Sequence, residues 1–286
     1  MSIEPNTHLI TRRTALATGA AASLVLATTL GGGTAAAAVP DAQPTSSASQ
    51  RAKTTVVLVH GAFADASSWN QVTPLLQARG HTVYAPANPL RGITADADYL
   101  RVFLSTIAGP ITLVGHSYGG AVITNAATGN PNVTALVYIA AYALAEGETI
   151  GAANELGGGT ALLGQHIQVR PFPGSGATDA DAYIDPAYFR IVFAQDLPAK
   201  TTNVMATAQR PLAASALGTP SGGPAWSSIP SWYLVARDDH AIPPQAERAM
   251  AKRARSHTVE ISSSHVAMLS HPRNVTDLIL AAAGCR

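Results

Sequence analysis

Short runs of β-branched and apolar residues alternate along most of the chain with longer segments of helical periodicity. The runs expected to form strands cover residues 54–59, 81–85, 111–114, 133–140, 231–236 and 258–261. The first run is β-branched or apolar almost throughout, which is typical of a strand buried on both faces of a parallel sheet. The pattern therefore predicts a parallel sheet of about six strands.

Segments with apolar residues at helical spacing follow these runs. The expected helices cover residues 67–78, 95–108, 121–128, 243–255 and 273–283. Ser67 or Ser68 is a suitable N-cap for the first of them, and Gly80 is expected to end it. Strands that alternate with helices form βαβ units with right-handed crossovers, so the predicted class is an α/β fold.

The alternation is interrupted between residues 142 and 229. This stretch shows no clear strand and contains Gly157-Gly158-Gly159, several prolines and the aromatic residues Tyr183, Tyr188, Phe189 and Phe193. A loop of that length inside a compact domain is expected to carry its own structure. The apolar segment 188–193 argues against a disordered insertion. We expect a helical cap over the carboxyl edge of the sheet.

The amino-terminal segment is expected to be a targeting segment rather than part of the fold. Arg12-Arg13 precede an uncharged run that ends in Ala36-Ala37-Ala38, which is the pattern of a cleaved export signal. The arginine pair resembles a twin-arginine signal. We expect a signal peptide over 1–38, a disordered linker over 39–52, and a secreted domain over 53–286. An uncleaved membrane anchor is the alternative, but so much alanine and glycine makes a poor spanning helix.

Composition excludes several other classes of function. The chain has 286 residues with 18 Lys+Arg against 17 Asp+Glu, so no basic field attracts nucleic acid. Cys285 is the only cysteine, which rules out an internal disulfide framework. No pair of histidines or cysteines has metal-ligand spacing, so we expect no metal and no cofactor. The expected state is a monomer or homodimer, with no nucleic-acid partner.

The segment 111–120 combines a predicted strand, the motif Gly115-x-Ser117-x-Gly119 and the start of a predicted helix. A serine at such a sharp turn has a strained backbone, which is tolerated where small residues flank it. The context predicts a nucleophile elbow that presents the Ser117 hydroxyl. A glycine- and serine-rich loop closing a βα unit is the alternative interpretation.

A nucleophilic serine needs a base, and that base needs an orienting carboxylate. Asp238 and Asp239 follow the fifth predicted strand, and His265 follows the sixth. The carboxyl ends of parallel strands meet at one edge of the sheet, so these groups are expected to meet Ser117. The residues alone leave the choice between the two aspartates open. His60 and His116 flank the motifs and are interpreted as packing residues that shape the turns.

From Thr54 onward, the chain resembles the α/β-hydrolase superfamily. The likeness is greatest to the branch of plant methyl-ester esterases and hydroxynitrile lyases with their bacterial esterase relatives. The motifs that carry it are Val59-His60-Gly61-Ala62, Gly115-His116-Ser117-Tyr118-Gly119-Gly120, Asp239-x-x-Ile242-Pro243 and His265-x-Ala267-Met268-Leu269. In that pattern the acid stands four residues before the proline, which implies Ser117, Asp239 and His265 as the catalytic residues.

The same turns predict the oxyanion hole. The backbone N–H groups of Ala62 and Tyr118 are expected to face the carbonyl oxygen as it becomes charged, with Phe63 as the alternative second donor. The expected function is cleavage of small carboxylic esters through an acyl-enzyme. The cap aromatics and Met205 indicate an apolar pocket.

Two other functions compete with this hypothesis. The hydroxynitrile lyases that the chain resembles carry a threonine before the oxyanion residue and a lysine after the histidine, whereas this chain has Gly61 and Val266. A leaving cyanide would therefore meet no ammonium group. A non-catalytic ligand-binding protein is the other alternative, because fold alone does not prove chemistry. Ser117 excludes a haloalkane dehalogenase, which needs a carboxylate at the elbow.

Overall fold

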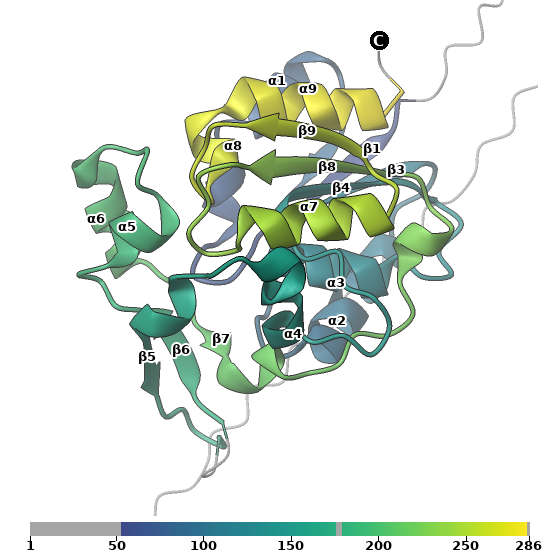
Figure 1. The fold of residues 1–286 in the computed structure, drawn as a ribbon. Coiled ribbons are helices and arrows are strands. Elements are labelled where there is room, and N and C mark those ends of the chain that lie inside the picture. Colours follow the sequence, from purple (N-terminus) through teal and green to yellow (C-terminus); the bar gives the residue numbers. More distant parts are fainter. Residues whose placement is uncertain (1–52, 176–178, 285–286) are drawn as a thin grey trace, which may run out of the picture. The chain divides into compact units, whose positions relative to one another are not determined.

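A computed structural model describes residues 53–175 and 179–284 of the chain (Figure 1). The expected signal peptide (1–38) and linker (39–52) lie outside the described residues, and so does Cys285.

Six parallel strands form the main sheet, which confirms the predicted fold class. They are β1 (Thr55–Val59), β2 (Val83–Tyr84), β3 (Ile111–Ser117), β4 (Val133–Ala141), β8 (Ser231–Ala236) and β9 (His257–Ile261). The strand order is β2-β1-β3-β4-β8-β9, and each neighbouring pair is parallel. The chain first adds β2 outside β1 and then returns to add β3 on the other side. The order therefore reverses between β1 and β3, where open α/β sheets form their binding crevice.

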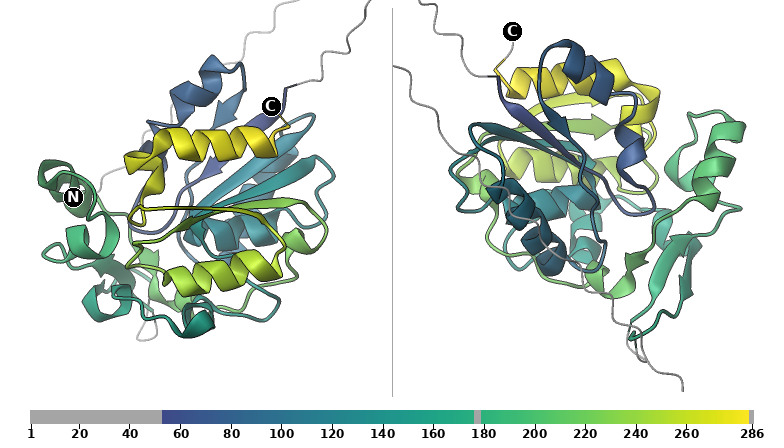
Figure 2. Two further views of the ribbon diagram at one scale, coloured as in Figure 1. Left: turned by 45° about the horizontal axis from the view of Figure 1, so that its top comes forward. Right: turned by 180° about the vertical axis from the view of Figure 1, so that it is seen from behind.

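Helices cover both faces of this sheet, as Figures 1 and 2 show. One face carries α1 (Thr73–Ala78) and α9 (Pro272–Ala282), which follows the short α8 (Ala267–Ser270). The other carries α2 (Ile93–Ser105), α3 (Tyr118–Ala126) and α7 (Pro244–Arg253). Every residue of β3 is buried between these layers, as its unbroken apolar start predicts.

The first helix differs from its prediction. Residues Ala66–Trp69 form a 3₁₀ turn, capped by the Asp65 side chain rather than by Ser67 or Ser68, and α1 begins only at Thr73. Pro74 explains the separate start, because its missing N–H is tolerated in a first helical turn but not in a helix interior. The expectation of one helix over 67–78 is therefore wrong.

The insertion between β4 and β8 is only partly helical. It contains α4 (Ile150–Asn154), α5 (Phe189–Phe193) and α6 (Ala199–Thr207), but also a second, antiparallel sheet of β5 (Ile167–Arg170), β6 (Asp181–Ile184) and β7 (Leu212–Ala213). Figure 1 shows α5, α6, β5 and β6 beyond the arrowheads of β8 and β9, at the carboxyl end of the main sheet. The expectation that the region lacks strands is corrected. Its strands are two to four residues long, too short for a recognisable alternation.

Candidate active site

Ser117 ends β3 at a sharp turn into α3. Its backbone angles are φ 53° and ψ −124°, a region that residues other than glycine rarely occupy. The turn also brings backbones close together, since a Cβ on Gly119 would lie 2.5 Å from the carbonyl oxygen of Val59. A Cβ on Gly115 would lie 2.6 Å from the carbonyl oxygen of Gly119. The two glycines of the motif are therefore sterically required.

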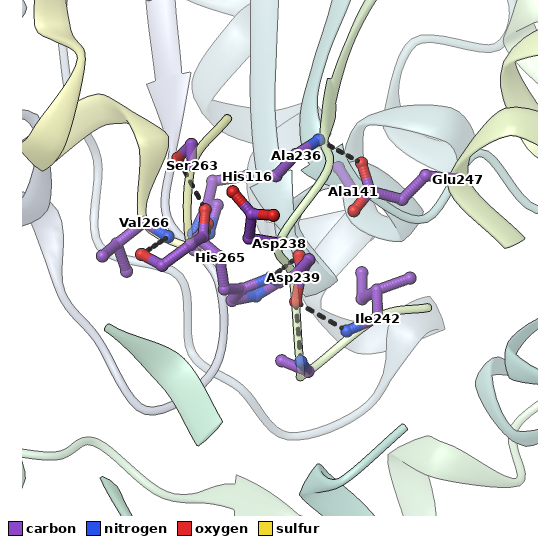
Figure 3. Close-up of polar contacts among 12 residues, drawn as sticks. His116, Ala141, Ala236, Asp238, Asp239, Ile242, Glu247, Ser263, His265 and Val266 are labelled. Carbon is purple, nitrogen blue, oxygen red and sulfur yellow. Dashed lines mark hydrogen bonds and ion pairs between the residues drawn. The ribbon is translucent and has the colours of Figure 1, made fainter. Parts of the chain in front are cut away.

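A histidine and an aspartate meet at the same end of the sheet. Asp239 follows β8 and His265 follows β9, and 2.5 Å separates Asp239 Oδ2 from His265 Nδ1. The other oxygen, Asp239 Oδ1, accepts hydrogen bonds from the N–H groups of Ala241 at 2.6 Å and Ile242 at 2.9 Å (Figure 3). Both Asp239 and His265 are buried. Three donors thus fix the carboxylate in one orientation.

Asp238 lies elsewhere. Its carboxylate is bonded to the hydroxyl of Ser262 at 2.5 Å and is exposed to solvent. The structure therefore brings Asp239, and not Asp238, to the ring of His265.

One small cavity is lined by Ser117, His265 and the candidate oxyanion residues. Its volume is about 20 Å³, and its lining includes Ala62, Phe63, Ser117, Tyr118 and His265. No hydrogen bond joins the Ser117 hydroxyl to the imidazole of His265 within the described residues, and such catalytic contacts are often loose until a substrate is bound.

The two candidate amides for the second oxyanion donor differ in their environment. The N–H of Phe63 donates to the carbonyl oxygen of Arg210 at 3.0 Å, so it is already engaged. Ala62 lies after β1 and Tyr118 is the first residue of α3, on either side of the point where the strand order reverses. An N–H in a first helical turn has no partner within its own helix. Of the two candidates for the second donor, Phe63 is thus the one whose N–H already has a partner.

Two buried histidines, His60 and His116, lie at the turn after β1 and at the turn from β3 into α3. His60 Nε2 accepts from the N–H of Asn88 at 2.9 Å, and its Nδ1 lies 2.8 Å from the carbonyl oxygen of Gly61, to which it donates. His116 Nε2 donates to the carbonyl oxygen of His265 at 3.0 Å. Burial lowers the pKa of His60 and lowers that of His116 further, so the His116 ring is held neutral. The two rings shape the turns around the cavity.

Asp96 and Glu247 are two acidic residues near the site that the sequence interpretation missed. The Tyr118 hydroxyl donates to Asp96 Oδ2 at 2.7 Å, which anchors the start of α3 beside Ser117. Burial raises the pKa of the Asp96 carboxyl. Glu247 lies on the buried side of α7, three residues before the buried Met250. Asp96 and Glu247 could both have been found in the sequence, because each is an acidic residue at a helical position that faces the core.

The insertion contributes to the site through Phe193 of α5. Its ring centroid lies 4.9 Å from that of His265 and 6.2 Å from that of Phe63. Phe63 also lines an outer cavity of about 200 Å³, whose wall includes the apolar residues Val204, Met205 and Leu269. An apolar compartment therefore adjoins the small cavity beside Ser117.

Within residues 53–175 and 179–284, no group of three or more histidine, cysteine, aspartate or glutamate side chains is arranged to hold a metal ion. No helix in the same residues is long and apolar enough to cross a bilayer.

A parallel sheet with a serine at the β3–α3 turn and a histidine–aspartate pair after β8 and β9 is an arrangement typical of serine hydrolases. Comparison with known families agrees. Residues 56–278 match the Alpha/beta hydrolase family, and the chain belongs to this family.

Individual relatives refine this class. The chain is 30% identical over 246 residues to a pyrethroid hydrolase of Sphingobium wenxiniae, covering 79% of this chain and 86% of that protein. It is 24% identical over 267 residues to the esterase PIR7B of Oryza sativa subsp. japonica, covering 82% and 97%. The crystal structure of a pyrethroid hydrolase from Sphingobium faniae JZ-2 matches with a TM-score of 0.68 and 26% identity, over 81% and 97% of the two chains.

These relatives are named as hydrolases and esterases, and one of them is a plant protein. The expected likeness to the esterase branch of the superfamily is confirmed, and the protein is a carboxylic ester hydrolase by class.

Proposed function

We propose that the protein cleaves small carboxylic esters through an acyl-enzyme on Ser117, with His265 as the general base and Asp239 as the orienting acid. The observation that carries this proposal is the hydrogen bond of 2.5 Å between His265 Nδ1 and Asp239 Oδ2. It leaves the other ring nitrogen, Nε2, as the proton acceptor of a histidine that shares a cavity with Ser117. A base held in this tautomer is what a serine nucleophile needs.

The chemistry follows from that tautomer. His265 Nε2 takes the Ser117 proton as Oγ attacks the ester carbonyl carbon, and the resulting oxyanion accepts hydrogen bonds from the Ala62 and Tyr118 N–H groups. The tetrahedral intermediate collapses, the C–O bond to the alcohol breaks, and His265 returns the proton to the leaving alkoxide. Water, deprotonated by His265, then attacks the acyl-enzyme; the bond between the acyl carbon and Ser117 Oγ breaks, His265 returns the proton to Oγ, and the acid is released. Each amide donor is worth about 10²–10³ in rate.

The substrates are proposed to be apolar esters. Val204, Met205 and Leu269 line the outer cavity of about 200 Å³, which supports a bulky apolar group on one side of the ester bond. The small cavity beside Ser117 supports a compact group on the other side. Relatives named pyrethroid hydrolases make esters with large apolar alcohol groups suitable test substrates.

Export is a separate part of the proposal. Arg12-Arg13 and the uncharged run that follows them support delivery of the folded enzyme across a membrane by a twin-arginine signal, followed by cleavage near Ala38. The enzyme is then proposed to act outside the cytoplasm.

A panel of chromogenic esters of increasing acyl length tests the enzymatic proposal. We expect a burst of released alcohol, stoichiometric with the enzyme, wherever deacylation is the slower step. Ser117→Ala should abolish the burst and lower kcat by about 10⁴–10⁶. Ser105→Ala, at an exposed position at the end of α2, is the matched control and should behave as the parent. Turnover by Ser117→Ala within about tenfold of the parent would contradict the assignment.

A further inference from the structure

Glu247 is a carboxyl group with no exposed surface, and it lies behind Asp239. It projects from α7 toward the end of β8, where its Oε2 accepts a hydrogen bond from the Ala236 N–H at 3.1 Å (Figure 3). Its Oε1 is fully buried and has no N–H or hydroxyl partner in the described part of the chain. Asp239 is bonded to the same residue, since its N–H donates to the carbonyl oxygen of Ala236 at 3.2 Å. The carboxyl of Asp239 acts on that of Glu247 through its charge and through a side-chain hydrogen bond, so the two buried acids are neighbours.

Two carboxylates in contact inside a protein cannot both be ionised, so one of them keeps a proton. Three donors surround Asp239, namely the N–H groups of Ala241 and Ile242 and the Nδ1–H of His265. Glu247 has one donor, the Ala236 N–H. Because hydrogen bonds to the charged form favour ionisation, the negative charge belongs on Asp239 and the proton on Glu247.

The positive charge that acts on Glu247 is that of Arg248, and its effect is smaller than those of burial and of Asp239. Arg248, its neighbour on α7, is half-exposed and forms an ion pair with Glu260 at 2.9 Å. The other titratable groups that face it are the phenols of Tyr142, after β4, and Tyr233, on β8. Burial raises the pKa of each phenol, so both are neutral. Burial and the charge of Asp239 likewise raise the pKa of Glu247 well above that of an exposed glutamate.

Resting on the proposed role of Asp239 as the triad acid, we propose that Glu247 is a positioning residue that stays protonated and donates its proton in a hydrogen bond to Asp239. The acid of the triad then has four donors: two backbone amides, the imidazole and a neutral carboxylic acid. A neutral donor orients the Asp239 carboxylate without cancelling the charge that stabilises the His265 imidazolium. Loss of the Glu247 proton would replace this hydrogen bond with repulsion between two anions.

Glu247→Gln is the sharpest variant, because an amide keeps both contacts. Its oxygen accepts from the Ala236 N–H and its NH₂ donates to Asp239. In the unfolded chain a glutamate ionises near pH 4.3, whereas the folded protein keeps the proton on Glu247. The parent therefore loses folding stability as pH rises above that value. The glutamine variant has no proton to lose at this position, so it does not show this loss.

The first experiment measures the folding equilibrium by urea denaturation between about pH 5 and pH 8. We expect the folding constant of Glu247→Gln, relative to the parent, to rise by up to about tenfold per pH unit until the folded carboxyl ionises. Glu155→Gln makes the same chemical change at an exposed position and should give a curve parallel to the parent. A parallel curve for Glu247→Gln would overturn the proposal.

The second experiment measures kcat/KM against pH for Glu247→Gln and Glu247→Leu. The glutamine variant should match the parent near neutral pH and keep its activity further into the alkaline range. The leucine variant, which gives Asp239 no donor and leaves the Ala236 N–H unpaired, should lose roughly ten- to hundredfold in kcat/KM. A leucine variant with the parent's rate and pH profile would also overturn the proposal.

The stability measurement needs no turnover, so it separates this inference from the proposed function. An active Ser117→Ala enzyme would refute the acyl-enzyme mechanism while the Glu247→Gln curve still reports the buried proton. An inactive Ser117→Ala enzyme combined with parallel stability curves would refute the role of Glu247 alone. If Glu247→Leu does not fold, the glutamine variant still decides the question.

Discussion

The side chain of His116 donates a hydrogen bond of 3.0 Å from Nε2 to the backbone carbonyl oxygen of His265. His116, which precedes the proposed nucleophile Ser117, thereby fixes the backbone of His265, the proposed base. The two imidazole rings also lie 4.7 Å apart between centroids. Burial lowers the pKa of His116 well below its ordinary value, and the nearby His265 lowers it further. A neutral His116 is therefore part of the folded structure.

This neutral histidine gives the first prediction, which concerns stability against pH. In the unfolded chain His116 binds a proton below about pH 6.5, whereas the folded protein excludes it. The unfolded state thus binds more protons, and stability falls as pH drops from 6.5 toward the folded pKa. His116→Gln lacks this dependence. The difference in unfolding free energy between parent and variant should change by about 1.4 kcal/mol per pH unit in that range.

Urea denaturation at several pH values checks this, with His257→Gln at an exposed position as the control. Parallel curves for the parent and His116→Gln would show that His116 titrates in the folded protein as it does in the unfolded chain.

The adjacent aspartates provide a matched pair for the second prediction. Asp239 bonds to His265, whereas the exposed Asp238 bonds to Ser262. Asp239→Asn presents a neutral amide to the imidazole and favours the wrong tautomer, so kcat should fall by about 10⁴. Asp238→Asn should cost less than about tenfold. Steady-state kinetics on one chromogenic ester suffices, and a reversed order of the two effects would reject Asp239 as the acid.

Residues at strand ends were the part of the site that the sequence could place. Ser117, Asp239 and His265 each follow a run predicted to be a strand of the parallel sheet, and the carboxyl ends of such strands share one edge. That argument needs only the order of elements along the chain. It does not choose between Asp238 and Asp239, because both follow β8, and the choice required the spacing seen in a known family.

Contacts between distant elements were not predictable in this way. Glu247 and Asp96 reach the site only because α7 packs against the sheet and α2 packs against α3, with those side chains turned inward. Phe193 touches His265 from a region whose short strands left no periodic pattern. Tertiary packing decides such contacts, so a sequence pattern can flag an acidic residue on an apolar face but cannot name its partner.

The third prediction concerns Arg12 and Arg13, which lie outside the described residues. Replacing both with lysine keeps the charge but removes the arginine pair that a twin-arginine signal requires. We expect the precursor to accumulate inside the producing cell and the mature enzyme to disappear from the exported fraction. Immunoblots of the two fractions measure this, with Lys53→Arg as a control outside the signal. Unchanged export of the double variant would show that another feature of the segment is recognised.

The last prediction separates ester hydrolysis from cyanohydrin cleavage. Both reactions would use Ser117 and His265, so the loss of activity in variants of those residues does not distinguish them. The reactions differ in the charge that the site must stabilise. Ester hydrolysis places it on an oxygen that faces backbone amides, whereas cyanohydrin cleavage expels cyanide, which requires a fixed cation beside the base. The residue after His265 is Val266, whose side chain is fully buried and apolar.

A cation at that position would be buried without a partner, which proteins avoid. We therefore expect no cyanide release from mandelonitrile above the uncatalysed rate, at enzyme concentrations that hydrolyse a chromogenic ester readily. A colorimetric cyanide assay run beside the ester assay makes the comparison on one preparation. Cyanide release without ester turnover would overturn the proposed reaction, yet it would leave the parallel sheet and the His265–Asp239 hydrogen bond as they stand, because the same base would then serve a different leaving group.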